Sequence, residues 1–317
     1  MHQCRIWKKT GILHLQKGEN RRCFKYLKNY YALKRAETKG ERNTRFCGQI
    51  GYNEIKYQYL VILGLTTTRY GIIMCKEDDR KGVEIVYLAG MQKLSLLDYP
   101  GVVACTLFTP GCNFRCPWCH NASLVLPEQF PAEFPDPEEV LAFLKKRQGI
   151  LDGVCITGGE PLLHAEIPDF IRRLKELGYR VKLDTNGSFP ERLRALTEEK
   201  LVDYVAMDIK NGPSRYAETI GLPRYQTEAV EESKNYLLTE VVEYEFRTTV
   251  VRGLHTEESL LEAAEWIRGA KAWYLQQFRD SGALIHGEGL SAFSEEEMQQ
   301  LLRAVQEKLP AAQLRGL

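Results

Sequence analysis

The feature that most constrains the fold of this chain is an alternation of short apolar segments with amphipathic segments, which recurs six times after residue 101. The apolar segments are rich in β-branched and aromatic residues, as expected of buried strands. Alternating units of this kind predict an α/β fold with a parallel sheet. The predicted strands cover residues 102–109, 153–157, 180–185, 204–209, 245–251 and 272–278.

Amphipathic helices are predicted between these strands. The first opens at Asp136 with a capping residue, which is followed by Pro137 and two acidic residues. The same reasoning predicts further helices at 167–177, 191–198, 227–238, 256–267 and 294–309. Six units are too few for the usual closed barrel of eight strands.

Three cysteines, Cys112, Cys116 and Cys119, follow the first predicted strand within eight residues. A 4Fe–4S cluster that only transfers electrons takes four thiolates, so three thiolates leave one iron open to another ligand. The alternative is a structural zinc site with His120 as the fourth donor. Zinc ligands usually come in pairs from two separated turns, and adjacent residues rarely reach the same ion. The spacing therefore favours a cluster with one open iron.

The spacing CxxxCxxC, with Trp118 just before the last cysteine, resembles the signature of the radical S-adenosylmethionine (SAM) superfamily. The resemblance implies that the cysteines hold a 4Fe–4S cluster whose open iron binds SAM. The reduced cluster would cleave SAM to methionine and a 5′-deoxyadenosyl radical, while the protein positions the cofactors and excludes water. The resemblance also implies a partial (β/α)6 TIM-like barrel with an open side. Trp118 is expected to shield the cluster from solvent.

The second predicted strand ends in a Gly-Gly-Glu-Pro motif that contains Gly158, Gly159 and Glu160. Ligands gather at the C-terminal ends of strands in such folds. Glycines allow the backbone to approach a ligand closely, and a carboxylate can accept hydrogen bonds from an ammonium group. In radical SAM enzymes this motif binds the amino group of SAM, and we expect the same of these three residues.

The third and fourth predicted strands end in the runs DTNG at 184–187 and MDIK at 207–210. Taken singly, their charged residues are explained by helix caps or surface ion pairs. Both runs resemble stretches of glycyl-radical-enzyme activases. That resemblance implies that Asp184, Asp208 and Lys210 lie around the SAM carboxylate and ribose, with a monovalent cation sometimes between them.

Two arginines near later strand ends are further candidates. Arg247 on the fifth strand would suit SAM or the backbone of a partner if it points into the barrel. Arg279 stands where pyruvate formate-lyase activases have a histidine, which argues against that subclass. Other residues are expected to be structural, either as surface or capping histidines or as small buried cysteines: His164, His255, His286, Cys105 and Cys155.

The chain most resembles the activating proteins of anaerobic ribonucleoside-triphosphate reductase, through residues 94–101 (LSLLDYPG), the CHN run at 119–121 and the LQQFR run at 275–279. This implies an enzyme that removes a hydrogen atom from a glycine of a glycyl radical enzyme, with flavodoxin or a ferredoxin-type protein as reductant. Two alternatives stay open within the superfamily: a pyruvate formate-lyase-type activase and an enzyme like 7-carboxy-7-deazaguanine synthase.

The charge distribution predicts a boundary near Met91. Residues 1–90 carry 18 Lys and Arg against 8 Asp and Glu, whereas the remainder carries 25 against 34. We therefore expect a basic N-terminal extension at 1–90 and a radical SAM core domain at 91–317. The extension is expected to be poorly ordered, or to be upstream sequence read from too early a start. A non-enzymatic module that binds zinc or nucleic acid is the less favoured alternative.

The sequence predicts a cytoplasmic protein without a membrane partner. Its longest apolar stretch, at 59–65, is far shorter than the roughly 20 residues that cross a bilayer. The N-terminus lacks the apolar core of a signal peptide. Nine irregularly spaced cysteines do not form a disulfide framework, and a thiolate-bound cluster requires a reducing compartment. A nucleic-acid partner is not expected.

Overall fold

The structure is a computed structural model of the 317-residue chain and describes residues 7–9, 12–14, 60–64, 70–74, 86–280 and 282–316. The chain divides into two units, Met1–Glu84 and Ile85–Leu317. The expectation that residues 1–90 are poorly ordered or mis-started lies mainly outside the described residues and stays a prediction. The described strands of the first unit form one sheet, in the order β1 (Trp7–Lys9), β2 (Ile12–His14), β4 (Tyr70–Met74) and β3 (Leu60–Gly64).

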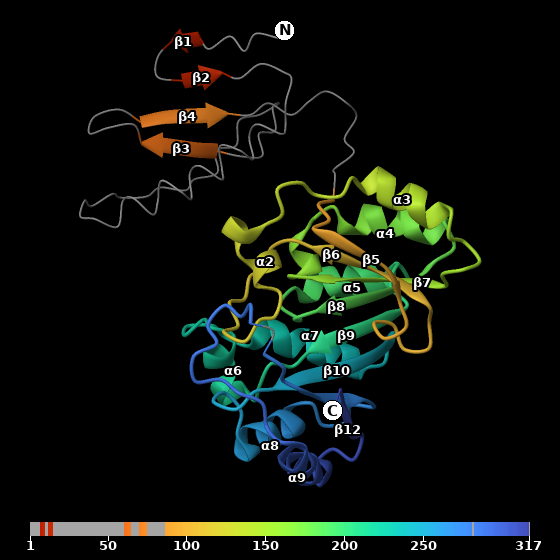
Figure 1. The fold of residues 1–317 in the computed structure, drawn as a ribbon, viewed down its shortest axis with the longest axis vertical. Helices are drawn as coiled ribbons and strands as arrows, with labels where there is room; N and C mark the ends of the chain where they lie inside the picture. Colours follow the sequence, from red (N-terminus) through yellow and green to blue (C-terminus); the bar gives the residue numbers. More distant parts are fainter. Residues whose placement is uncertain are drawn as a thin grey trace. The chain divides into compact units, whose positions relative to one another are not determined.

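The second unit, called the core unit below, is built on one eight-stranded sheet whose strands follow the chain order from β5 to β12 (Figure 1). Strands β6 to β12 are parallel, and β5 is antiparallel to β6. The strands are β5 (Gly90–Ser95), β6 (Ala104–Thr109), β7 (Gly153–Gly158), β8 (Arg180–Thr185), β9 (Tyr204–Asp208), β10 (Glu243–Val250), β11 (Trp273–Gln277) and β12 (Ala312–Arg315).

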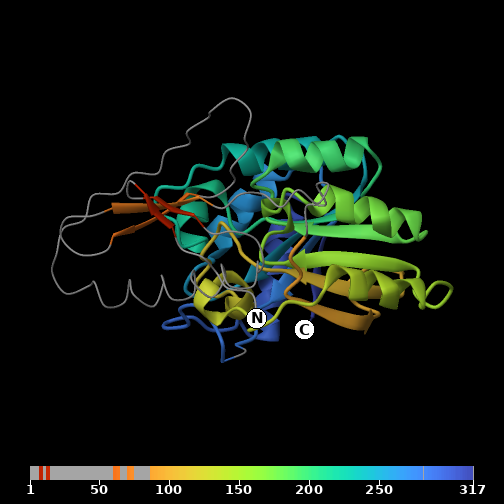
Figure 2. The same ribbon diagram turned by 90° about the horizontal axis from the view of Figure 1, so that it is seen from above.

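The helices of the core unit lie along the outer face of the curved sheet, as the two views in Figures 1 and 2 show. Asp136 begins α3 as expected, because its side chain accepts a hydrogen bond from the Glu138 backbone N–H at 2.9 Å. The main helices are α3 (Pro137–Lys145), α4 (Ile167–Glu176), α5 (Pro190–Glu198), α6 (Pro213–Thr219), α7 (Glu228–Leu238), α8 (Glu257–Trp266) and α9 (Glu295–Gln306).

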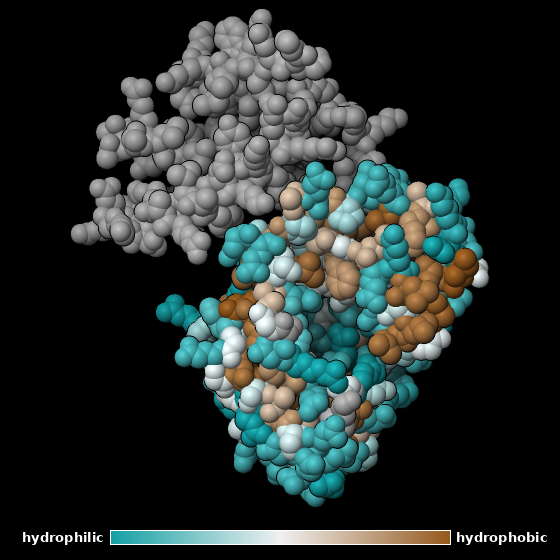
Figure 3. Space-filling view, viewed as in Figure 1, coloured by the Kyte–Doolittle hydropathy of each residue, from teal (hydrophilic) through white to brown (hydrophobic). Residues whose placement is uncertain are grey.

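Strand alternation separates an apolar outer face of the sheet from a polar inner face. In β8, Val181 and Leu183 are fully buried in the core, whereas Lys182 and Asp184 face the other way and pair with each other. Figure 3 shows the same polar character, because hydrophilic residues line the hollow near the middle of the core unit. The inner face is therefore equipped to bind a polar ligand.

The predicted partial barrel is confirmed, and all six predicted strands and six predicted helices are present with ends shifted by a few residues. The prediction missed β12 and β5, which occupy the two ends of the sheet. Strand β12 is only four residues long and contains Gln313 and Arg315, so it lacks an apolar run. Strand β5 has exposed residues at its centre.

The core unit begins a few residues before Met91, between Glu84 and Ile85. Val86 and Leu88 are only 3% and 0% exposed, because both side chains pack into the hydrophobic core. Among the described residues, no helix combines the length and the apolar character needed to cross a membrane.

Candidate functional site

A cavity of about 250 Å³ opens among the loops that follow the parallel strands of the core unit. All of the residues predicted to hold the cluster or to contact SAM, except Glu160, line it. They come from four separate segments of the chain, so the fold brings together what the sequence keeps apart. The predicted residues at the cavity are Cys112, Cys116, Trp118, Cys119, Gly158, Gly159, Asp184, Asp208 and Lys210.

The cysteine loop, residues 111–120, curls so that its three thiols face this one cavity. The Cys119 backbone N–H donates to the Cys116 carbonyl at 3.0 Å, and the Arg115 guanidinium donates to the carbonyls of Cys112 and Phe114. Burial raises the pKa of Cys112 to about 11 and that of Cys116 to about 12. These thiols are protonated at neutral pH unless a metal takes the place of the proton.

Two glycines hold the end of β7 and the turn after it directly against the end of β6 and the start of the cysteine loop. A Cβ atom on Gly159 would lie 1.8 Å from the Gly111 carbonyl oxygen, and one on Gly158 would lie 2.4 Å from the Thr109 backbone nitrogen. Gly158 also has a φ of +125°, which favours glycine. Backbone hydrogen bonds of 2.9 Å from Gly159 to Thr109 and 2.8 Å from Glu160 to Gly111 join the two segments. No side chain fits at this contact.

Glu160 is fully buried, and its carboxylate faces the protein interior. It accepts hydrogen bonds from the Leu162 N–H at 3.0 Å, the Thr185 hydroxyl at 2.8 Å and the Asn186 N–H at 2.7 Å. Burial outweighs these bonds and raises its pKa to about 7. The carboxylate ties the turn after β7 to the turn after β8. Its binding of the SAM amino group stays a prediction.

Opposite the cysteine loop, a chain of alternating charges crosses the ends of β8, β9 and β10. Arg247 lies between the two aspartates, 3.1 Å from Asp184 Oδ2 and 2.9 Å from Asp208 Oδ1. Lys210 Nζ lies 2.9 Å from Asp208 Oδ2, and Lys182 pairs with Asp184. Burial alone would raise the pKa of Asp208, but Arg247 and Lys210 lower it to about 2. Burial alone would also raise the pKa of Asp184, but Arg247 and Lys182 lower it, so both aspartates are ionised.

These paired residues, Lys182, Asp184, Arg247, Asp208 and Lys210, are called the charged side below. The charged side meets the cysteine loop at Lys210, whose Nζ lies 5.0 Å from the centre of the Trp118 ring. Behind it, His255 is 3% exposed, with Nε2 2.8 Å from the Lys210 carbonyl oxygen and Nδ1 accepting from the Val251 N–H at 3.1 Å. Burial lowers its pKa to about 4, so the ring is neutral. His255 is thus a buried partner of the backbone and not a surface residue.

Sequence reasoning missed several residues that line the cavity, among them Asn186 after β8, Thr249 on β10 and Gln276 on β11. Strand alternation could have found Thr249, which is two residues after Arg247 and faces the same way. Gln276 lies beside Thr249 on the neighbouring strand. Arg279, by contrast, is exposed and donates to the Gly316 carbonyl at 3.0 Å. Cys105 and Cys155 are fully buried, as predicted.

The donor set at the cavity fits an iron–sulfur cluster. Three thiols from one loop face a single cavity, and the opposing backbone has no side chains that would fill it. Each iron of a cluster takes one thiolate, so the thiols need not converge on a point. A zinc site would need several donors around one ion, and within the described residues no group of three or more His, Cys, Asp or Glu side chains is placed to do so.

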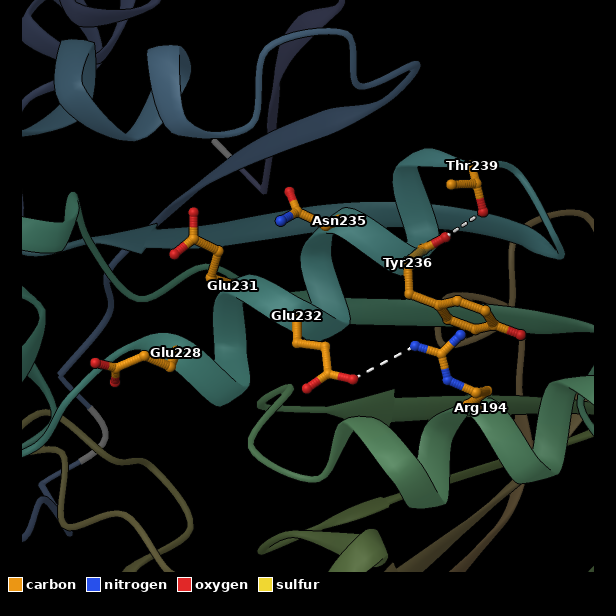
Figure 4. Close-up of a pocket in the computed structure, with 7 residues that line it drawn as sticks. All are labelled: Arg194, Glu228, Glu231, Glu232, Asn235, Tyr236 and Thr239. Atoms are coloured by element: carbon orange, nitrogen blue, oxygen red, sulfur yellow. Dashed lines mark hydrogen bonds and ion pairs between the residues drawn. The ribbon is translucent and has the colours of Figure 1, made fainter.

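A second depression, of about 490 Å³, lies between α5 and α7 (Figure 4). Arg194 of α5 crosses it to Glu232, at 3.4 Å, and stacks on Tyr236. Its remaining lining is polar and solvent-exposed and consists of Glu228, Glu231, Asn235 and Thr239. It contains none of the predicted site residues, and we assign it no ligand.

Known proteins resemble this chain in both sequence and fold. Residues 106–268 match the family described as the radical SAM superfamily. A candidate glycyl-radical enzyme activating enzyme of Methanocaldococcus jannaschii is 33% identical over 204 residues, which cover 62% of this chain and 81% of that protein. The 7-carboxy-7-deazaguanine synthase of Methanopyrus kandleri is 33% identical over 125 residues, but these cover only 33% of this chain and 49% of that protein. A radical SAM methyltransferase from Sphaerobacter thermophilus shares the fold, with a TM-score of 0.55 and 15% identity over 70% of this chain and 68% of that one.

Proposed function

The chain belongs to the radical SAM superfamily, and we propose that it is an activase that generates a glycyl radical on an anaerobic ribonucleoside-triphosphate reductase. The observation that carries the proposal is one cavity bounded by three cysteine thiols, a side-chain-free glycine turn and the Asp208–Lys210 pair. The similarity to the M. jannaschii protein over 81% of that protein's length supports the activase class.

In this proposal Cys112, Cys116 and Cys119 hold a 4Fe–4S cluster, and SAM lies between the cluster and the charged side of the cavity. The cofactors supply reductive cleavage of SAM to a 5′-deoxyadenosyl radical, which takes the hydrogen atom from the partner's glycine. The protein's part is to bind and orient. The paired Asp208 and Lys210 present one anionic and one cationic group to the amino acid and ribose portions of SAM. Trp118, which is 7% exposed, limits the access of water.

The partner assignment rests on three local runs: residues 94–101, the CHN run at 119–121 and the LQQFR run at 275–279. They resemble stretches of the activating proteins of anaerobic ribonucleoside-triphosphate reductase. A flavodoxin or a ferredoxin-type protein is the proposed electron donor, and the cytoplasm the proposed location.

A second candidate function is a small-molecule radical SAM reaction like that of 7-carboxy-7-deazaguanine synthase. The observation in its favour is the 33% identity to the M. kandleri enzyme, which is confined to 49% of that enzyme's length. The two functions differ in substrate, since one acts on a protein backbone and the other on a pterin. A glycyl radical signal therefore separates them.

The first test is 5′-deoxyadenosine formation by protein that has been reconstituted anaerobically with iron and sulfide and then given SAM and a strong reductant. Cys119→Ala is the control and is expected to form none. The reductase is then added, and electron paramagnetic resonance (EPR) is expected to detect a glycyl radical. Cleavage of SAM without a glycyl radical signal would reject the reductase as the partner of this protein.

A chain that begins at Ile85 is expected to behave like the full chain in both assays, since it keeps Val86 and Leu88 in the core. Loss of cluster and activity in the shortened chain would instead favour a function that depends on the basic N-terminal residues, such as nucleic-acid binding.

A further inference from the structure

The side chain of Asn186, in the turn after β8, faces the cavity and contacts a cysteine sulfur. Asn186 is 5% exposed, and its Nδ2 lies 3.9 Å from Cys112 Sγ and 2.9 Å from Asn113 Oδ1. Its Oδ1 accepts from the Ser188 N–H at 2.9 Å and from the Ser188 hydroxyl at 2.6 Å. A backbone N–H can only donate, so the oxygen of the Asn186 amide must face Ser188. The NH₂ group must therefore face the sulfur.

A closed ring of hydrogen bonds fixes this orientation. Asn113 in the cysteine loop accepts from Asn186 and donates its own Nδ2 to Ser188 Oγ at 2.8 Å. The Asn186 backbone is also held in place, since its N–H donates to the buried carboxylate of Glu160 at 2.7 Å. Both the side chain and the backbone of Asn186 are thus held against the cysteine loop.

Cys112 differs from the other two cysteines in its donors. Its Sγ accepts from the Phe114 backbone N–H at 3.3 Å in addition to the Asn186 side chain. In the described part of the chain, neither Cys116 Sγ nor Cys119 Sγ has a side-chain donor among its hydrogen bonds. Cys119 receives a backbone hydrogen bond from Asn121. Among these three described cysteines, Cys112 alone would therefore place its corner of the proposed cluster beside a side-chain amide.

We propose that Asn186 is a positioning residue that raises the reduction potential of the cluster by directing its amide N–H at the Cys112 thiolate. The inference rests on the proposed function, because it requires that Cys112 bind iron. Reduction adds one electron, taken from the donor protein, and so increases the negative charge on the cluster and its thiolates. The positive end of an N–H dipole at a thiolate stabilises the reduced state more than the oxidised state.

The test is an EPR-monitored redox titration of the full chain, reconstituted anaerobically without SAM. Asn186→Ala removes the donor and is expected to lower the reduced-to-oxidised ratio at a fixed solution potential about tenfold, a shift of about 59 mV to more negative potential for one electron. Asn186→Asp also adds a negative charge and is expected to shift the potential further. Asn113→Ala is the matched control, because it breaks the ring while the Ser188 N–H still binds the Asn186 amide oxygen and Glu160 still binds the Asn186 backbone N–H.

An unchanged potential in Asn186→Ala would overturn the proposal, as would an equal shift in Asn113→Ala, which would assign the effect to loop geometry. If neither Asn186 variant takes up iron, a second measurement tests the proposal. It uses the parent protein with asparagine labelled with ¹⁵N in the side-chain amide. A magnetic coupling between that nitrogen and the reduced cluster is expected, and its absence would overturn the proposal. Failure of the parent protein itself to bind iron would reject the proposed function instead.

Discussion

On one side of the cavity the cysteine loop and the Gly158–Gly159 turn meet through backbone atoms, whereas on the other side Asp184, Arg247 and Asp208 meet through ion pairs. The first side depends on the absence of side chains, because the two segments approach more closely than a Cβ atom allows. The second side depends on complete pairing, because its charges are largely buried. The two sides should therefore be disrupted by different substitutions. Adding an atom should disrupt the first side, and removing a charge should disrupt the second.

The largest effect is expected from Gly159→Ala. The new Cβ would lie 1.8 Å from the Gly111 carbonyl oxygen, so the backbone of the cysteine loop must move. We expect the variant to bind almost no iron, and the free energy of unfolding to fall by about 5 kcal/mol. Iron content after reconstitution and urea denaturation before iron is added measure the two effects.

Gly90→Ala is the matched control for this change. A Cβ at Gly90 would meet only the Phe108 ring at 3.8 Å, which is an ordinary contact. The control should bind iron like the parent. Normal iron binding by Gly159→Ala would show that the loop does not need this close contact.

The motifs of both sides could be predicted from sequence because each is local. The cysteine spacing, the glycine pair and the DTNG and MDIK runs each lie within a few residues and follow a strand. The pairing across the charged side could not, because Arg247 is 63 residues from Asp184 and 39 from Asp208. The direction of the Glu160 side chain could not be predicted either, since its partners Thr185 and Asn186 belong to the next β/α unit.

Arg247→Met tests the charged side and is expected to have the second largest effect. It leaves two ionised, largely buried carboxylates without the cation between them. We expect the free energy of unfolding to fall by about 3–5 kcal/mol at pH 7, and SAM binding to be lost. Iron content should stay near that of the parent, because the cysteine loop makes no hydrogen bond to Arg247.

The pH dependence of this variant gives a further check. A carboxylate whose pKa is lowered by folding stabilises the folded state at pH values above its ordinary pKa of 3.8. That stabilisation is lost as the pH falls through the pKa of the folded state, which is about 2 for Asp208. The stability difference between parent and Arg247→Met should thus be full at pH 7 and shrink below pH 4. Arg194→Met, which removes an exposed pair (Figure 4), should change stability little. A difference that grows as the pH falls would contradict the assignment.

Glu160 joins the two sides, and Glu160→Met is expected to weaken both to a smaller extent. The change leaves the Leu162 N–H, the Asn186 N–H and the Thr185 hydroxyl without their buried acceptor. We expect the free energy of unfolding to fall by about 1–3 kcal/mol, with lower iron content and weaker SAM binding. Glu160→Gln keeps one acceptor oxygen and should lose less. Equal losses in the two variants would show that the hydrogen bonds are not the cause.

The smallest effect is expected where Lys210 of the charged side lies over the Trp118 ring of the cysteine loop. A double-mutant cycle of Trp118→Leu and Lys210→Met isolates this contact from the loss of ring area and the loss of the Asp208 pair. The Lys210 side chain is 14% exposed, so its cation is largely removed from water, and we expect a coupling of about 1–2 kcal/mol in urea denaturation. Trp118→Phe in the same cycle should retain most of that coupling, because it keeps an aromatic face. Additive effects in the cycle would mean that the Lys210 and Trp118 side chains touch without stabilising each other.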